Sequence, residues 1–170
     1  MIASREYVKD LICKVLSRYT KGYCKLGFIS NNGSTYVSVN PNSDIPFDKF
    51  LDGNLEYNLT NHSIKLKAGR SYNLKCIHHY NGGSSYIIGF YDLTNKKYLG
   101  TSMRVLGGND ESNLLEDIYT PEIDCEVTAR LYWSSSSQAT TMRVSEVNTS
   151  SQALGLAGGD QEVVFMVIEI

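Results

Sequence analysis

Hydrophobic and polar residues follow two different periods along this chain. Between Ser4 and Tyr19 the apolar residues recur every three or four positions, which is typical of an amphipathic helix. Ser4 can cap the start of this helix, and Gly22 marks its end. The apolar stripe consists of Tyr7, Val8, Leu11, Ile12, Val15, Leu16 and Tyr19. We therefore predict an N-terminal helix within residues 1–22, which attaches the chain to a partner or takes part in assembly.

After Gly22 apolar and polar residues alternate, and turn signals separate roughly eight to ten short segments, which indicates an antiparallel sandwich or barrel. In the segment 126–133 this alternation places Val127, Ala129, Leu131 and Trp133 on one face. Pro121 confines the segment 118–123 to an edge. The other strands are predicted at residues 36–39, 45–51, 55–59, 63–66, 71–80, 85–93, 98–105, 140–147 and 162–170.

The turn residues suggest how neighbouring strands are joined. Asn81-Gly82-Gly83-Ser84 predicts a hairpin, Asp92 to Lys97 a second turn, and residues 107–113 a loop. Gly69 separates two alternating segments and is expected to form a bend or a bulge, unless it is an ordinary loop glycine. In the strand that follows, Tyr72 and Leu74 are expected to point into the core.

The last strand is apolar on both faces. Val163, Phe165 and Val167 alternate with Val164, Met166 and Ile168. An antiparallel strand with one solvated face would alternate with polar residues, so this strand must be covered twice. The second cover is either the N-terminal helix or another subunit.

Composition narrows the class of protein. The chain has 170 residues, a net charge of −2, 42% hydrophobic and 20% charged residues, as in an ordinary globular domain. We find no clustered basic face for nucleic acid, no apolar run of the ~18 residues that cross a membrane, and no apolar leader at the start. The four cysteines, Cys13, Cys24, Cys76 and Cys125, lack C-x-x-C spacing and are expected to be reduced and mostly buried.

Candidate catalytic chemistry is sparse. His78 and His79 are adjacent on a predicted strand, so their imidazoles point to opposite faces and cannot chelate one metal ion. The acidic residues Asp44, Asp48, Asp52 and Glu56 are spaced by four, yet Pro46 and Gly53 argue against a helix there, and a solvated loop face is favoured. A calcium site around Asn109, Asp110 and Glu111 lacks EF-hand spacing. We therefore expect no enzyme activity, no metal and no cofactor; a hydrolase with an unrecognised site is the remaining alternative.

The twelve tyrosines either populate strands or form a binding surface suited to sugars.

One segment carries a family resemblance. "SIKLKAGRSYNLKC" (residues 63–76) resembles the strand junction of C1q/TNF-like jelly-roll domains, preceded by Asp52-Gly53-Asn54 and followed by a strand from Tyr86 to Tyr91, a strand ending at Gly100 and an apolar last strand. The resemblance spans roughly residues 35–170. The same segments are similar to jelly-roll domains of phage and other virion surface proteins. The resemblance implies a mainly β, antiparallel jelly-roll sandwich at residues 23–170, preceded by the helix, and a compact trimer.

The expected function follows from this layout. We expect a non-enzymatic virion structural protein, namely a capsid decoration, head-fibre or tail-associated protein that assembles in the host cytoplasm. It would contact other virion proteins through the helix, and a host-surface glycan through the β domain, without binding nucleic acid or membrane. The alternative is a carbohydrate-binding, lectin-like module. The predicted interface of the homotrimer consists of Val163, Val164, Phe165, Met166, Val167 and Ile168.

Overall fold

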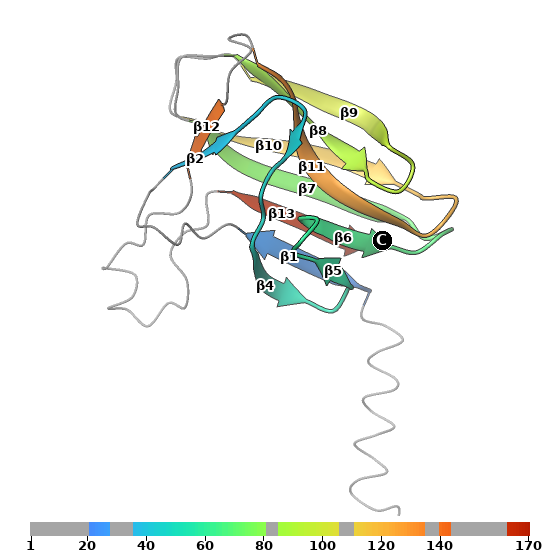
Figure 1. The fold of residues 1–170 in the computed structure, drawn as a ribbon. Helices are drawn as coiled ribbons and strands as arrows, with labels where there is room; N and C mark the ends of the chain where they lie inside the picture. Colours follow the sequence, from blue (N-terminus) through green and yellow to red (C-terminus); the bar gives the residue numbers. More distant parts are fainter. Residues whose placement is uncertain (1–20, 28–35, 81–84, 106–110, 135–139, 144–162) are drawn as a thin grey trace, which may run out of the picture.

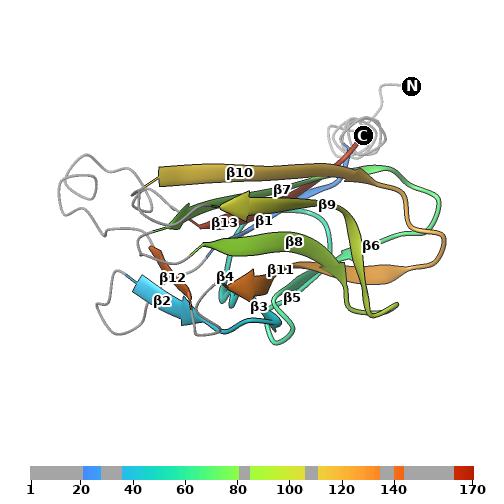
Figure 2. The same cartoon turned by 90° about the horizontal axis from the view of Figure 1, so that it is seen from above.

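Two antiparallel β-sheets pack face to face in this chain (Figures 1 and 2). The structure, a computed structural model, describes residues 21–27, 36–80, 85–105, 111–134, 140–143 and 163–170. Sheet A contains β1 (Tyr23–Gly27), β2 (Tyr36–Val39), β4 (Lys49–Gly53), β7 (Tyr72–Tyr80), β10 (Glu111–Tyr119), β12 (Thr140–Arg143) and β13 (Val164–Glu169). Sheet B contains β3 (Ser43–Asp44), β5 (Tyr57–Asn58), β6 (Ser63–Leu66), β8 (Tyr86–Asp92), β9 (Lys97–Val105) and β11 (Cys125–Ser134).

The chain path is that of a jelly roll. In sheet A the order of the principal strands is β10-β7-β13-β1, and in sheet B it is β6-β11-β8-β9. Among these strands, β8 and β9 form a hairpin, whereas every other sequential pair crosses from one sheet to the other. Consecutive strands therefore face each other across the core instead of pairing, which is the double-sheet arrangement of jelly rolls.

Strand β7 organises sheet A. Its whole length pairs with β10 on one edge, while β13 and then β12 pair with successive parts of the other edge. Side chains at alternate positions of β7 point inward, so Tyr72, Leu74, Cys76 and His78 are all buried. The predicted inward orientation of Tyr72 and Leu74 is confirmed.

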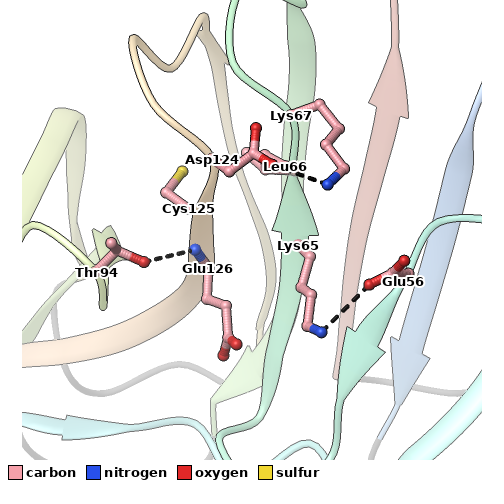
Figure 3. A pocket seen from close by; sticks show the side chains of 8 residues that line it. All are labelled: Glu56, Lys65, Leu66, Lys67, Thr94, Asp124, Cys125 and Glu126. Atoms are coloured by element: carbon pink, nitrogen blue, oxygen red, sulfur yellow. Dashed lines mark hydrogen bonds and ion pairs between the residues drawn. The ribbon is translucent and has the colours of Figure 1, made fainter.

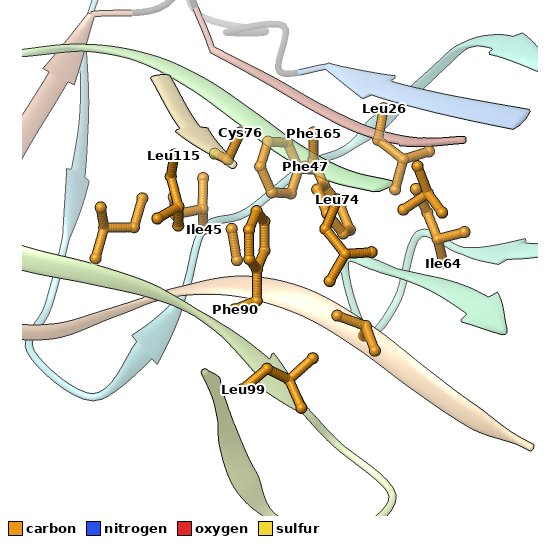
Figure 4. Packing of buried hydrophobic residues seen from close by; sticks show 14 of the residues in the cluster. Leu26, Ile45, Phe47, Ile64, Leu74, Cys76, Phe90, Leu99, Leu115 and Phe165 are labelled. Atoms are coloured by element: carbon orange, nitrogen blue, oxygen red, sulfur yellow. The ribbon is translucent and has the colours of Figure 1, made fainter. Parts of the chain in front are cut away.

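The core fills the space between the sheets (Figure 4). Phe165 of β13 lies at its centre, with ring centroids 5.6 Å from Phe47 and 5.8 Å from Phe90 of β8. Phe47 and Ile45 belong to a segment that leaves sheet B at β3 and enters sheet A at β4, and both side chains are fully buried. The predicted strand 45–51 is therefore wrong in its first half, where the chain crosses the sandwich before β4 begins.

Gly69 lies in the turn between β6 of sheet B and β7 of sheet A. The Arg70 amide donates to the Lys67 carbonyl at 3.4 Å, and Gly69 has a φ of 72°. This left-handed conformation favours glycine because it lacks a Cβ. The predicted bend is confirmed as a tight turn that transfers the chain between the two sheets.

The hairpin predicted at Asn81–Ser84 is wrong. Strands β7 and β8, which flank these residues, belong to different sheets and pack face to face. Both strands carry a continuous inward row of large side chains, and each row is buried by facing the other across the core. The Gly-Gly residues themselves lie outside the described part of the chain, and a turn sequence does not decide whether the strands that flank it pair or stack.

Two strands of sheet A, β1 and β10, were not predicted as such from the sequence. Strand β10 overlaps the ends of the predicted loop at 107–113 and of the predicted edge segment at 118–123, its middle residues 114–117 were assigned to neither, and Pro121 lies beyond its end. Strand β1 directly follows Gly22 and was not predicted. The stripe of the predicted helix, residues 7–19, lies outside the described residues.

The predicted face of β11 is correct for Val127, Ala129 and Leu131, which are fully buried, but wrong for Trp133. A β-bulge between Leu131 and Trp133 inserts one residue, and Trp133 pairs with the outward-facing Ile87. An extra residue reverses the side-chain alternation beyond it. Trp133 therefore lies on the outer face of sheet B and is 39% exposed.

Candidate interaction surfaces

The six predicted interface residues of the last strand lie in two environments, the core and the outer face of sheet A. Phe165 and Val167 point inward and, with Val163, belong to the core of the chain itself. Met166 and Ile168 lie on the outer face of sheet A and are half-buried, and Val164 on the same face is almost fully buried. Sheet B therefore covers one face of β13, and only the outer face remains for a second cover.

The outer face of sheet A carries exposed apolar side chains. In register across the sheet, Ile77 of β7 lies between Val164 of β13 and Leu114 of β10. Leu114 is 46% exposed. Ile118, four residues further along β10 on the same face, is 64% exposed. Leu114, Ile77 and Val164 thus form one apolar row across the sheet, and an exposed apolar row of this kind favours an interaction site.

A polar row crosses the same face. The Lys75 ammonium lies 2.9 Å from the Glu116 carboxylate, and Asn73 donates to that carboxylate at 2.8 Å. The hydrogen bonds from Asn73 and Lys75 hold the pKa of Glu116 below its ordinary value. In register with Lys75 lie the apolar Met166 of β13 and, beyond it, Lys25 of β1. The face thus combines apolar side chains with fixed charges, as protein interfaces do.

The sequence makes this face hard to recognise because β10 carries apolar and polar residues on both of its faces. Its inward positions are Asn113, Leu115, Asp117 and Tyr119, whereas Leu114 and Ile118 point outward. A search for a continuous apolar row that faces the core therefore fails there. The useful signal would have been two aliphatic residues, Leu114 and Ile118, four positions apart on one face of a strand, with Glu116 between them.

A second surface lies on the outer face of sheet B. The rings of Tyr91 of β8, Tyr98 of β9 and Tyr132 of β11 are in contact there. Together with the exposed Trp133, which follows Tyr132 in the chain, we term them the aromatic platform. The Tyr98 ring lies edge-to-face with Tyr91 at 4.9 Å and with Tyr132 at 5.0 Å between centroids. Such edge-to-face pairs fix ring positions. Sequence reasoning missed the platform because its rings come from three strands and are brought together only by the sheet register.

Arg130 of β11 contacts one ring of the platform and an acidic residue of β3. Its guanidinium carbon lies 3.5 Å from the centroid of the Tyr91 ring, and its Nε lies 2.6 Å from Oδ1 of Asp44. The Arg130 side chain is 17% exposed, so the ion pair is largely shielded. The positive charge of Arg130 is therefore compensated by Asp44 at the Tyr91 ring.

A polar depression of about 240 Å³ lies nearby over β6 and β11 (Figure 3). Its charged side chains are paired: Lys67 with Asp124 at 2.8 Å, and Lys65 with Glu56 at 3.2 Å. Glu126 accepts a hydrogen bond from the Ser63 hydroxyl at 2.8 Å. These contacts describe a solvated, ion-paired face.

The histidine and cysteine side chains that the structure describes on the strands are buried. His78 is buried and its Nδ1 is hydrogen-bonded to Tyr86, while the side chain of His79 lies outside the described residues. Cys24, Cys76 and Cys125 have free, buried thiols. Burial raises the pKa of Cys24 to about 11 and that of Cys125 to about 12, so these thiols stay neutral near pH 7.

Metal and membrane signals were sought in the described part of the chain. There, no three His, Cys, Asp or Glu side chains lie close enough together to hold a metal ion. Within the same residues, no helix has the length and apolar character to span a membrane.

Comparison with known proteins identifies the fold. No protein-family model matches the chain, and no curated protein matches it either. Among solved structures, the chain is similar to the Eiger TNF of S. frugiperda, with a TM-score of 0.58 and 6% identity over 88% of this chain and 93% of that one. It is also similar to the globular domain of zebrafish complement 1qA, with a TM-score of 0.50 and 10% identity over 88% of this chain and 94% of that one. Together with the strand order, these likenesses show that the chain has the C1q/TNF-like jelly-roll fold.

Proposed function

We propose that this chain is a non-enzymatic structural protein that assembles as a homotrimer through the outer face of sheet A. The observation that carries the proposal is the pair Leu114 and Ile118, which project from the edge strand β10 into solvent. Edge strands of isolated domains normally carry charges or are covered, because exposed apolar edges promote association. A partner subunit supplies such a cover.

A closed ring is compatible with the proposed kind of contact. The apolar side chains of β10 lie at one edge of the sheet, whereas Met166 and Ile168 lie in the middle of its face. If the edge of one subunit packs on the face of the next, the contact is heterologous, and such a contact forms a ring when the rotation between subunits closes. A trimer is also what the C1q/TNF-like resemblance implies.

The energetic gain is modest for each residue and is repeated in every subunit. Full burial of a Leu or Ile side chain contributes about 1.5–3 kcal/mol. Leu114 and Ile118 are 46% and 64% exposed, so covering them contributes about 1–2 kcal/mol each. The half-buried Met166 and Ile168 and the exposed Ile77 add to this over the same face.

Paired variants of two isoleucines test the interface. Ile118→Asp places a charge in the proposed contact and should shift the trimer to monomer in light scattering. Ile123→Asp is the matched control, because Ile123 is 51% exposed and lies outside the sheet, after β10. Ile123→Asp should remain trimeric. If both variants keep the trimer mass, or both lose it, this face is not the interface.

We propose further that the trimer belongs to a virus particle, as a capsid decoration, head-fibre or tail-associated protein assembled in the host cytoplasm. In this proposal the N-terminal segment binds other virion proteins. The support is the similarity of its strand segments to virion jelly-roll domains. Capsid or tail genes beside this gene, and the protein in purified particles by mass spectrometry, are the expected findings. A gene among unrelated metabolic genes, with no protein in particles, would contradict it.

A further inference from the structure

We propose that the aromatic platform on the outer face of sheet B is a binding site for an uncharged saccharide. This site lies on the opposite side of the sandwich from the proposed trimer interface. The inference does not depend on the oligomeric state, and the two proposals can fail separately.

Two irregularities of the strands build the platform. The bulge in β11 makes Tyr132 and Trp133, which are adjacent in sequence, both exposed, at 50% and 39%. A second register shift, between β8 and β9, falls beside Tyr91, next to its partner Tyr98. Bulges typically re-aim side chains at functional sites. In a regular strand, Tyr132 and Trp133 would point to opposite faces, and one of them would enter the core.

The rings are held before any ligand arrives. Tyr98 makes edge-to-face contacts with Tyr91 and Tyr132, and Tyr91 lies against the guanidinium of Arg130. Arg130 is in turn fixed by Asp44 at 2.6 Å. A preorganised site loses little side-chain entropy on binding. Side chains of this kind provide rigid contact area, and their phenol groups offer polar tips at its border.

The size of the surface favours a small ligand over a protein. With about 200 Å² per aromatic side chain, the exposed parts of Tyr98, Tyr132 and Trp133 amount to roughly 250 Å². A stable protein interface needs about 800 Å² on each partner. The flanking positions of β9, Lys97, Ser102 and Arg104, are exposed and polar, so the apolar surface does not extend beyond the rings on that side.

The electrostatics favour an uncharged ligand with hydroxyl groups. The charge of Arg130, whose guanidinium lies over the Tyr91 ring, is compensated by Asp44. Burial raises the pKa of the Tyr98 phenol, so this group stays protonated at neutral pH and can donate a hydrogen bond. A neutral sugar ring has an apolar C–H face that stacks on an aromatic ring, and hydroxyl groups around its edge that meet these polar tips.

Trp133 is the single tryptophan of the chain and therefore serves as an intrinsic probe. The full-length protein is titrated with cellotriose, maltotriose and N-acetyllactosamine while tryptophan emission is recorded, and a glycan array of neutral oligosaccharides extends the search. We expect a saturable blue shift with at least one neutral saccharide, because stacking removes water from the indole. Absence of a saturable shift and of array binding across these saccharides overturns the proposal.

Variants locate the site. Tyr132→Ala and Tyr98→Ala should each weaken binding by at least tenfold, while Tyr132→Phe, which keeps the ring, should weaken it less than threefold. Tyr57→Ala is the matched control, since Tyr57 is 39% exposed but lies on β5, stacked on Phe50 and apart from the platform. Unchanged affinity in both Ala variants of the platform contradicts the site. Exclusive binding of sialylated sugars that is lost in high salt contradicts an uncharged ligand.

Discussion

The Tyr86 hydroxyl lies 2.7 Å from Nδ1 of His78, and this hydrogen bond joins the two sheets inside the core. Tyr86 belongs to β8 of sheet B and His78 to β7 of sheet A, and both side chains are fully buried. At the other end of β8, the Asp92 carboxylate accepts a hydrogen bond from Tyr119 of β10 at 3.1 Å. The inward row of β8 is therefore apolar at its centre, with Ile88 and Phe90, and polar at both ends.

Removal of the Tyr86 hydroxyl tests the first of these bridges. Tyr86→Phe keeps the ring but leaves Nδ1 of His78 without this partner in a dry environment. We expect the free energy of unfolding, from urea denaturation, to fall by about 1–3 kcal/mol. Tyr132→Phe on the exposed platform should change it by less than ~0.5 kcal/mol. Equal effects of the two variants would show that the buried hydrogen bond contributes nothing specific.

The second bridge predicts sensitivity to acid. Burial acts to raise the pKa of Asp92, but the hydrogen bonds from Asn95 and Tyr119 outweigh it, and the pKa lies below its ordinary value of 3.8. A carboxylate with a lowered pKa stabilises the fold above the pKa of the unfolded chain, and this contribution is lost as pH falls through the lower pKa of the folded state. Stability should therefore decline as pH falls below about 4.

Thermal melts of Asp92→Asn measure this contribution. The variant should be less stable than the natural protein at pH 7, and the difference between them should shrink as the pH falls toward about 2. Tyr119→Phe, which retains the carboxylate, should reduce the acid dependence only in part. A difference that is constant across this pH range would mean that Asp92 is not the titrating group.

The turn at Gly69 gives a prediction about backbone strain. A Cβ at Gly69 would meet no atom within 4 Å, so any cost of substitution comes from its φ of 72°. Gly69→Val should cost about 1–3 kcal/mol, and Gly69→Asn clearly less, because Asn tolerates the left-handed region. Gly53→Ala should cost more than Gly69→Ala, since its Cβ would lie 2.4 Å from the Tyr23 carbonyl oxygen. Equal melting temperatures for Gly69→Val and Gly69→Asn would contradict the assignment of strain to this turn.

Truncation tests the expected attachment role of the N-terminal segment. The described core begins at Cys24, and β1 is held at its start by the Glu169 amide, which donates to the Gly22 carbonyl at 2.7 Å. A chain lacking residues 1–20 should therefore remain folded by circular dichroism and keep its oligomeric mass, while losing attachment to its partner. An unfolded or insoluble product would instead assign the predicted helix to the core.

The sequence predicted the architecture better than the pairing of its strands. Alternation located β6, β7, β8 and β11, because each has one face in a single continuous core. The hairpin expected at Asn81–Ser84 failed because a turn sequence reports a reversal and not the sheet that receives the next strand. Strand β10 was missed because Leu114 and Ile118 face outward, where a partner and not the chain itself would cover them.

The interaction surfaces were harder to predict from the sequence than the core. The doubly apolar character of residues 163–168 predicted two covers for β13; sheet B supplies one of them, and the second stays a prediction. The aromatic platform depends on the bulge beside Tyr132 and on the register that brings Tyr98 next to it. Bulge positions follow from tertiary packing, so alternation alone placed Trp133 in the core.

Light scattering coupled to size-exclusion chromatography of the full-length protein at micromolar concentration tests the central claim most directly. The account predicts a single species with three times the chain mass of 19.0 kDa. This species should convert to monomer when Ile118→Asp places a charge on the outer face of sheet A. A monomer mass for the natural protein at this concentration would contradict the proposal, and would mean that Leu114 and Ile118 remain exposed in the functional state.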